Sequence, residues 1–236
     1  MPLAGFICCQ TGEPSGCGSC LAMARSGECA YPLPLLSTMA AHKESRNGLG
    51  ISSTDVSGCP RQYVLKNRFD FYESPEDYCA RFRGSGLHSQ MESAGPYHGV
   101  LQEERFFGTI SGVPISGMPD WVDITNKEIL DWKTCSAIPR EAYDSHILQL
   151  NIYAELLHQS NIEVDKGAVW YFDGRKFRRR TIPIWQGRER TERLETAVHP
   201  FLQTLRSDSE IPDRIPEYPN HFLCKYCPVK DHCDTL

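Results

Sequence analysis

The pattern of hydrophobic and polar positions changes along the chain, from segments that favour helices before residue 94 to segments that favour strands after residue 104. We expect helices over Pro34–Lys43, Ser53–Lys66 and Ser74–Ser93. The third has the strongest start signal, because a capping serine precedes a proline and acidic residues occupy the first turn. Gly84 and Gly86 lie inside it as potential breaks.

The middle of the chain predicts an antiparallel meander. Runs of strand-forming residues cover Arg105–Ile110, Ile115–Ile124 and Lys127–Lys133, and turn-forming residues separate them. Apolar residues then return to helical spacing, which predicts a helix over Arg140–His158.

The last third of the chain predicts a hairpin and an amphipathic helix. Val169–Phe172 and Lys176–Ile184 flank Asp173-Gly174, a strong hairpin signal. A helix kinked at Pro200 should follow, with its apolar face formed by Leu194, Val198, Phe201, Leu202 and Leu205. These elements together predict an α/β fold with a central mixed β-sheet between helices.

Composition limits the classes of protein that fit. The chain has 236 residues and can form one large domain, or one domain with appendages. We expect a cytoplasmic protein without a membrane partner, because no apolar run approaches the length of a span and the N-terminus lacks a signal-peptide layout. The net charge of −5 argues against a generally basic nucleic-acid surface but allows a local basic groove over an acidic site. Eleven cysteines, in a reducing compartment, indicate metal rather than disulfides.

Two carboxylates and a lysine suggest hydrolytic chemistry. Asp120 ends the segment Gly117-Met-Pro-Asp, and Asp131 and Lys133 belong to the next predicted strand. Residues two apart in a strand share a face, so Asp131 and Lys133 should lie together. Carboxylate oxygens are the ligands that Mg²⁺ and Mn²⁺ prefer. The set is suited to metal-assisted phosphodiester hydrolysis, with the lysine orienting water and stabilising charge.

Residues on the flanking helices complete this candidate site. His88 adds an imidazole ligand to Asp120 and Asp131, and the Trp132 carbonyl is a potential fourth ligand. Gln149 and Tyr153 are four residues apart on one helical face, from which they could hold the lysine, the strand or the DNA backbone.

The order of these residues resembles the successive motifs of RecB-like nucleases in the PD-(D/E)xK superfamily. The resemblance covers about residues 52–236 and rests on Gly84-x-x-x-His88, Gly117-x-x-Asp120, Asp131-x-Lys133 and Gln149-x-x-x-Tyr153. It implies a restriction-endonuclease-like core over residues 46–236, which hydrolyses DNA with Mg²⁺ or Mn²⁺. The position of Asp131 often holds glutamate in this family, and both types occur.

The later cysteines resemble those of the iron–sulfur branch of these nucleases, which includes the CRISPR-associated exonucleases and AddB-type nuclease domains. The resemblance implies that a [4Fe–4S] cluster closes the core, with the ligands Cys59, Cys224, Cys227 and Cys233. Four thiolates can hold either zinc or such a cluster. Spacing alone favours zinc, and the resemblance favours the cluster.

Residues 1–45 lie outside this resemblance and form a cysteine-rich appendage. The segment has too little apolar content to fold alone, so we expect structural Zn²⁺ on Cys8, Cys17, Cys20 and Cys29. Cys9 is an alternative to Cys8, and a second iron–sulfur site is an alternative to zinc.

The function expected from these observations is single-strand DNA exonuclease activity, since no separate base-reading module is visible. Basic residues that could contact phosphates are Arg61, Lys176, Arg178 and Arg180. One alternative is a subunit that trims or selects DNA ends in a CRISPR-integration or helicase–nuclease complex. Another is a DNA-binding scaffold without catalysis, against which the complete set of site residues argues.

Overall fold

The computed structural model describes residues 3–41, 50–93, 95–206 and 210–236. The chain folds into two compact units, each assembled from separate parts of the sequence. The first unit comprises Met1–Leu49, Cys59–Phe82 and Ser209–Leu236, and the second comprises Gly50–Gly58 and Arg83–Asp208. The boundary predicted between residues 45 and 46 falls outside the described residues.

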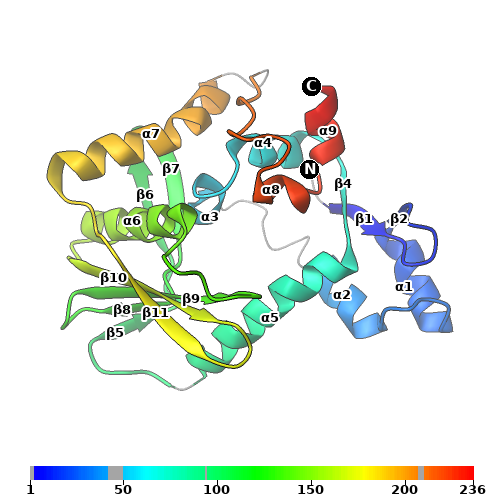
Figure 1. The fold of residues 1–236 in the computed structure, drawn as a ribbon, viewed down its shortest axis with the longest axis horizontal. Helices are drawn as coiled ribbons and strands as arrows, with labels where there is room; N and C mark the ends of the chain where they lie inside the picture. Colours follow the sequence, from blue (N-terminus) through cyan, green and yellow to red (C-terminus); the bar gives the residue numbers. More distant parts are fainter. Residues whose placement is uncertain (1–2, 42–49, 94, 207–209) are drawn as a thin grey trace. The chain divides into compact units, whose positions relative to one another are not determined.

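A five-stranded mixed sheet dominates the second unit (Figure 1). Its strands, in spatial order, are β11 (Phe177–Ile182), β10 (Lys166–Phe172), β9 (Glu128–Thr134), β8 (Trp121–Asp123) and β5 (Val100–Gln102). β9 and β10 are parallel, and every other neighbouring pair is antiparallel. Asp173-Gly174 forms the turn between β10 and β11, with Gly174 at φ 89°, a conformation that glycine adopts without strain. The predicted hairpin is therefore confirmed.

The second unit also contains a three-stranded sheet, and one helix contacts both this sheet and the five-stranded one. Its order is β3 (Ile51–Ser52), β7 (Val113–Gly117) and β6 (Phe106–Ile110). The helix α6 (Asp144–Gln159) contacts strands of both sheets, and α7 (Gly187–Arg206) packs on α6, β6 and β7. Buried residues of α6 and β10, including Leu150, Leu156 and Val169, form the core. The α/β architecture with helices around mixed sheets is the predicted one.

The first unit is built from short elements. A three-stranded sheet has the order β2 (Pro14–Gly16), β1 (Leu3–Ile7) and β4 (Phe71–Glu73). The helices are α1 (Cys17–Ser26), α2 (Leu33–Ala41), α4 (Pro60–Arg68), α8 (Phe222–Lys225) and α9 (Lys230–Thr235). One apolar cluster forms around Phe6, Leu36 and Met39, and another around Leu65 and Val229. The predicted helix end at Lys43 lies outside the described residues.

Three predicted elements differ from the observed ones. The helix expected over Ser53–Lys66 is two helices, α3 (Ser53–Val56) and α4, because Pro60 has no N–H to continue the first one. The strand expected over Ile115–Ile124 is also interrupted, and its halves belong to different sheets. The meander is thus two antiparallel pairs, β6–β7 and β8–β9. In contrast, α5 (Pro75–Glu92) runs through Gly84 and Gly86 without a break.

None of the helices in the described part of the chain combines the length and the apolar content that crossing a membrane requires.

Candidate metal centre and active site

Asp120 lies where the chain passes from one sheet to the other, between the end of β7 and the start of β8. Pro119 precedes it and has no N–H for a strand ladder. The Asp120 side chain is buried, and its Oδ2 accepts a hydrogen bond from the Trp132 N–H at 2.6 Å. Since β8 pairs with β9 only from Trp121 onward, the Asp120 carboxylate satisfies a main-chain group of β9 that β8 leaves unpaired. Asp120 was expected within a strand and lies instead at this break.

Glu103 reaches the same point from the other side of β8. In the antiparallel pairing of β5 with β8, Gln102 lies opposite Trp121, so the next residues outward, Glu103 and Asp120, are neighbours. Glu103 has φ 50°, in the left-handed region that side chains other than glycine rarely adopt. Such conformations concentrate at functional sites. No sequence motif indicates Glu103, because its position depends on the strand register and on the turn.

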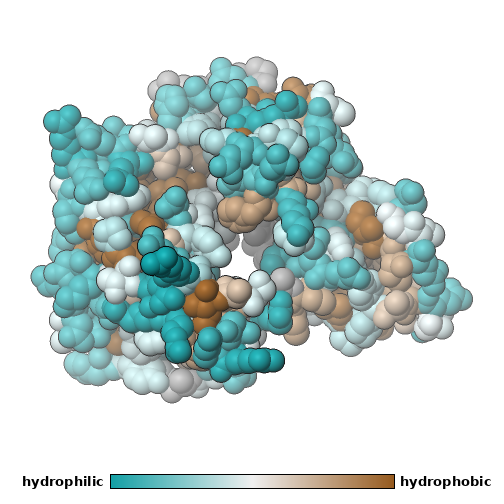
Figure 2. Space-filling view, viewed as in Figure 1, coloured by the Kyte–Doolittle hydropathy of each residue, from teal (hydrophilic) through white to brown (hydrophobic). Residues whose placement is uncertain are grey.

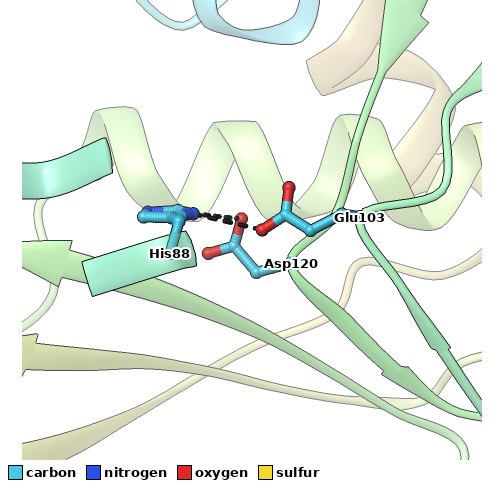
Figure 3. Close-up of side chains that lie close together, drawn as sticks. All are labelled: His88, Glu103 and Asp120. Atoms are coloured by element: carbon cyan, nitrogen blue, oxygen red, sulfur yellow. Dashed lines mark hydrogen bonds and ion pairs between the residues drawn. The ribbon is translucent and has the colours of Figure 1, made fainter. Parts of the chain in front are cut away.

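His88, on α5, completes a cluster of three ligands (Figure 3). Its Nδ1 lies 3.2 Å from Asp120 Oδ1 and 3.3 Å from Glu103 Oε1. The ligand atoms of these three side chains lie within 4.8 Å of one another, and within the described residues no other group of three or more His, Cys, Asp or Glu side chains meets this spacing. An imidazole and two carboxylates suit Mn²⁺ or Mg²⁺.

The main chain of Trp132 orients this cluster. Its N–H donates to Asp120, and its carbonyl oxygen lies 3.1 Å from His88 Nε2. A hydrogen bond from Nε2 to this carbonyl leaves Nδ1 facing the two carboxylates, as is usual for histidines that bind metal. The carbonyl was predicted as a fourth metal ligand, and in this structure it lies against the His88 ring.

The charge of His88 depends on its two acidic neighbours. Hydrogen bonding to Asp120, and then to Glu103, raises the pKa of His88 from 6.5 to about 10, although burial opposes the shift. Without a metal the ring is therefore an imidazolium that balances the carboxylates at neutral pH. A divalent cation at this position would displace the ring proton.

Asp131 and Lys133 form a buried pair beside this cluster. Both lie on β9 and share a face, as predicted, with Lys133 Nζ 2.7 Å from Asp131 Oδ2. Burial alone would lower the pKa of Lys133, but the Asp131 carboxylate reverses this effect and raises it, so the amine stays charged. Asp131 is 1% exposed, and its Oδ1 has no hydrogen-bond partner in the described part of the chain. A buried carboxylate oxygen in this state is suited to a cation.

Gln149 and Tyr153 share one face of α6, as predicted. Gln149 Nε2 donates to the Tyr153 hydroxyl at 2.7 Å and to Thr54 Oγ1 at 3.3 Å. Burial raises the pKa of Tyr153, which therefore remains protonated. A Cβ on Gly117 would come within 2.7 Å of the Tyr153 ring, so only glycine lets β7 approach α6 this closely. The glycine of the Gly117-x-x-Asp120 motif thus has a packing role.

His146 is a second residue near this site that the sequence did not indicate. It lies on α6, one turn before Gln149, and its Nδ1 is 2.7 Å from the Tyr171 hydroxyl. Burial, together with the charge of Lys133, lowers the pKa of His146 to about 4. The ring is therefore neutral at physiological pH and adds no charge beside the Asp131–Lys133 pair.

The residues predicted to contact DNA fall into two groups. Lys176 and Arg178 are exposed at the hairpin of β10 and β11, where Figure 2 shows mainly hydrophilic side chains. Arg180 is half-buried there, and its Nε donates to the Pro139 carbonyl at 3.0 Å. Arg61 is only 7% exposed, since its guanidinium is engaged inside the first unit. Its prediction as a phosphate contact is therefore corrected to a role at the cysteine site.

The four cysteines predicted to bind a cluster line one cavity of the first unit, with an empty volume of about 370 Å³, part of it open to solvent. These residues are Cys59, Cys224, Cys227 and Cys233. Donors from α4 point at their sulfurs: Arg61 Nε lies 3.2 Å from Cys233 Sγ, and Gln62 Nε2 lies 3.3 Å from Cys227 Sγ. The Gln62 N–H donates to the Cys59 sulfur, which caps the helix. Such N–H groups stabilise thiolates.

The N-terminal cysteines are arranged differently from the prediction. Cys8, Cys9, Cys20 and Cys29 line a common cavity. Cys17, which was expected in this set, instead lies with its sulfur 3.9 Å from the Ala4 carbonyl. Cys17 and Cys20 are three apart on α1, and only Cys20 is directed into the cavity.

The similarity of this chain to known proteins extends over parts of both units. Residues 92–234 match the family described as the PD-(D/E)XK nuclease superfamily. The chain belongs to this superfamily. Its fold is also similar to the crystal structure of SSO0001, with a TM-score of 0.58 and 20% identity over 84% of this chain and 93% of that one. A comparison with curated protein sequences finds no match.

Members of the PD-(D/E)XK superfamily are metal-dependent nucleases, and the residues present here fit that chemistry. His88, Glu103 and Asp120 offer one nitrogen and two carboxylate groups at a single point, and Asp131 contributes a buried oxygen that has no hydrogen-bond partner among the described residues. This donor set suits a hard divalent cation such as Mg²⁺ or Mn²⁺.

Proposed function

We propose that this PD-(D/E)XK protein is a metal-dependent exonuclease that hydrolyses DNA phosphodiester bonds at single-stranded ends. The observation that carries the proposal is the convergence of His88, Glu103 and Asp120 at one point, oriented by the strand that also bears the buried Asp131–Lys133 pair. The sequence supports action at ends, since it contains no separate base-reading module.

Each residue has a defined task in the proposed reaction. His88, Glu103 and Asp120 would hold Mg²⁺ or Mn²⁺, and the Asp131 carboxylate would add a further oxygen ligand. The bound ion supplies positive charge and lowers the pKa of water. The Lys133 ammonium orients the attacking water and stabilises the negative charge that develops on the phosphate.

The residues on α6 keep this arrangement in place. Gln149 bonds to Tyr153 and to Thr54 of α3, so it fixes α6 against α3. The buried hydroxyl of Tyr153 stays protonated and does not act as a base. Lys176, Arg178 and the half-buried Arg180 supply positive charge for contacts with the DNA backbone.

We further propose that Cys59, Cys224, Cys227 and Cys233 bind a [4Fe–4S] cluster. All four cysteines line one cavity, and N–H groups donate to the sulfurs of Cys59, Cys227 and Cys233. These contacts, together with the resemblance of the cysteine pattern to that of iron–sulfur nucleases, support a cluster with a structural role.

A cleavage assay on two forms of DNA tests the enzymatic proposal. Protein purified without oxygen is incubated with end-labelled linear and with circular single-stranded DNA, with Mg²⁺ and Mn²⁺ in turn. We expect shortening of the linear substrate and an intact circle. Cleavage of the circle would overturn the exonuclease proposal, and DNA binding without any cleavage would indicate a scaffold instead.

A further inference from the structure

The cavity of the N-terminal cysteines brings three separate segments together. Cys8 and Cys9 follow β1, Cys20 lies on α1, and Cys29 precedes α2. The remaining walls are apolar or aromatic and include Phe6, Met23, Tyr31 and Leu36. Cys20 is 5% exposed and belongs to the apolar cluster of this segment.

Two of these thiols already have the separation of ligands on one ion. Cys9 Sγ and Cys29 Sγ lie 3.7 Å apart and form no disulfide. Two thiolates on a tetrahedral zinc ion lie about 3.8 Å apart, since each Zn–S bond is about 2.3 Å. An independent contact holds the two segments in place, because Gln10 Nε2 donates to the Glu28 carbonyl at 2.6 Å.

The turn after β1 contains Cys8, which is a further thiol of this cavity. The Cys8 N–H donates to the Glu13 carbonyl, and the Gly12 N–H returns to the Cys8 carbonyl, which closes the turn. The turn therefore fixes the main chain at Cys8, whose side chain lines the same cavity as Cys9.

Cys20 and Cys29 line the cavity from α1 and from the segment before α2. Cys17, whose sulfur lies 3.9 Å from the Ala4 carbonyl, is not among the described residues that line it.

We propose that Cys9, Cys20 and Cys29, with Cys8 as the fourth ligand, bind a structural Zn²⁺ ion that joins β1, α1 and the segment before α2. No three of these sulfurs lie within 4.8 Å of one another, so the proposal requires Cys8 and Cys20 to move toward the Cys9–Cys29 pair when the ion binds. Each coordinating thiol releases its proton to solvent on binding. The site is independent of the proposed nuclease centre and cluster.

Thiol labelling of the wild-type protein tests the ligand set without relying on variants that could unfold. The full-length protein is alkylated before and after treatment with a zinc chelator, and the labelled cysteines are identified by mass spectrometry. We expect Cys8, Cys9, Cys20 and Cys29 to be protected until the chelator is added, while the exposed Cys79 reacts in both samples. Labelling of Cys9 and Cys29 that the chelator does not change, or a Cys9–Cys29 disulfide, would overturn the proposal.

Metal analysis of two matched variants tests whether Cys9 or Cys17 is a zinc ligand. The structure favours Cys9, and spacing along the sequence favours Cys17. Zinc and iron are measured in the wild type, Cys9→Ser and Cys17→Ser. We expect one zinc per chain in the wild type and Cys17→Ser, and loss of zinc in Cys9→Ser with the iron content unchanged. Loss of zinc in Cys17→Ser but not in Cys9→Ser would contradict the assignment, as would iron in place of zinc at this site. Nuclease activity is recorded separately, so a failure here leaves the enzymatic proposal standing.

Discussion

At the scale of single residues, the candidate metal centre combines three side chains with the main chain of Trp132. His88, Asp120 and the Trp132 main chain belong to motifs with fixed spacing, and they lie together as expected. Glu103 belongs to no such motif. Its place beside Asp120 follows from the register of β5 on β8 and from its left-handed φ, neither of which can be derived from the sequence alone.

Glu103 and Glu104 form a matched pair for testing the added ligand. Glu103→Gln should weaken Mn²⁺ binding and lower the rate of cleavage by about 10–100-fold, a range typical for groups that support a metal site. Glu104→Gln should leave both unchanged, because Glu104 is exposed and lies outside the cluster. Metal titration and single-turnover cleavage measure the two effects. Equal behaviour of the two variants would exclude Glu103 as a ligand.

The raised pKa of His88 predicts how metal affinity depends on pH. Metal binding requires the neutral ring, and in the metal-free protein the ring keeps its proton up to about pH 10. Affinity for Mn²⁺ should therefore rise with pH below that value, by about tenfold per unit if one proton is released.

His88→Asn should bind Mn²⁺ more weakly and with a much smaller dependence on pH, since the competing proton is gone. Calorimetric titration between pH 6.5 and 8.5 measures both slopes. The same steep slope in wild type and variant would assign the proton to another group.

At the scale of elements, prediction succeeded where hydrophobic periodicity is long and failed where a single residue redirects the chain. The hairpin around Asp173-Gly174 and the helix α6 were expected from turn chemistry and apolar spacing. The break between β7 and β8 was not expected. Gly117, Pro119 and Asp120 disfavour a strand, but the sequence does not show that the residues on either side of them belong to different sheets. Because of this break, the Asp120 side chain lies in the candidate metal centre.

Two motif glycines should respond in opposite ways to alanine. Gly117→Ala should destabilise the protein by about 1–3 kcal/mol, because its Cβ would overlap the buried Tyr153 ring. Gly84→Ala should be neutral or stabilise by up to about 1 kcal/mol, since it lies within α5 and its Cβ would meet only Thr134 Oγ1 at 3.6 Å. Urea unfolding of both variants measures the difference. A tolerated alanine at Gly117 would show that β7 and α6 can move apart.

At the scale of the whole molecule, each compact unit combines segments that are far apart in sequence. The first unit gathers Cys59 with Cys224, Cys227 and Cys233 around one cavity. Cysteine spacing and the resemblance to iron–sulfur nucleases indicated this set in advance. For the N-terminal cysteines, spacing along the sequence did not predict which side chains share a cavity. Cys17 and Cys20 are one helical turn apart, and only Cys20 lines the cavity.

Loss of the proposed cluster should therefore affect the stability of the chain as well as its colour. Protein prepared without oxygen should absorb in the visible range, and Cys227→Ser should remove this absorption and lower the melting temperature, because ligands from Cys59 to Cys233 close a long loop. Cys135→Ser, which replaces a cysteine outside both cavities, is the control. A colourless wild type that contains zinc alone would contradict the cluster.

The most direct test of the central claim measures Mn²⁺ binding and DNA cleavage on the same samples of wild type, Asp120→Asn and Asp165→Asn. Asp165 is an exposed aspartate outside the cluster and serves as the matched control. We predict that wild type and Asp165→Asn bind Mn²⁺ and cleave over the same range of metal concentration, and that Asp120→Asn loses both properties while it still unfolds cooperatively. Metal-dependent cleavage by Asp120→Asn at the wild-type rate would contradict the assignment of the active site to this centre.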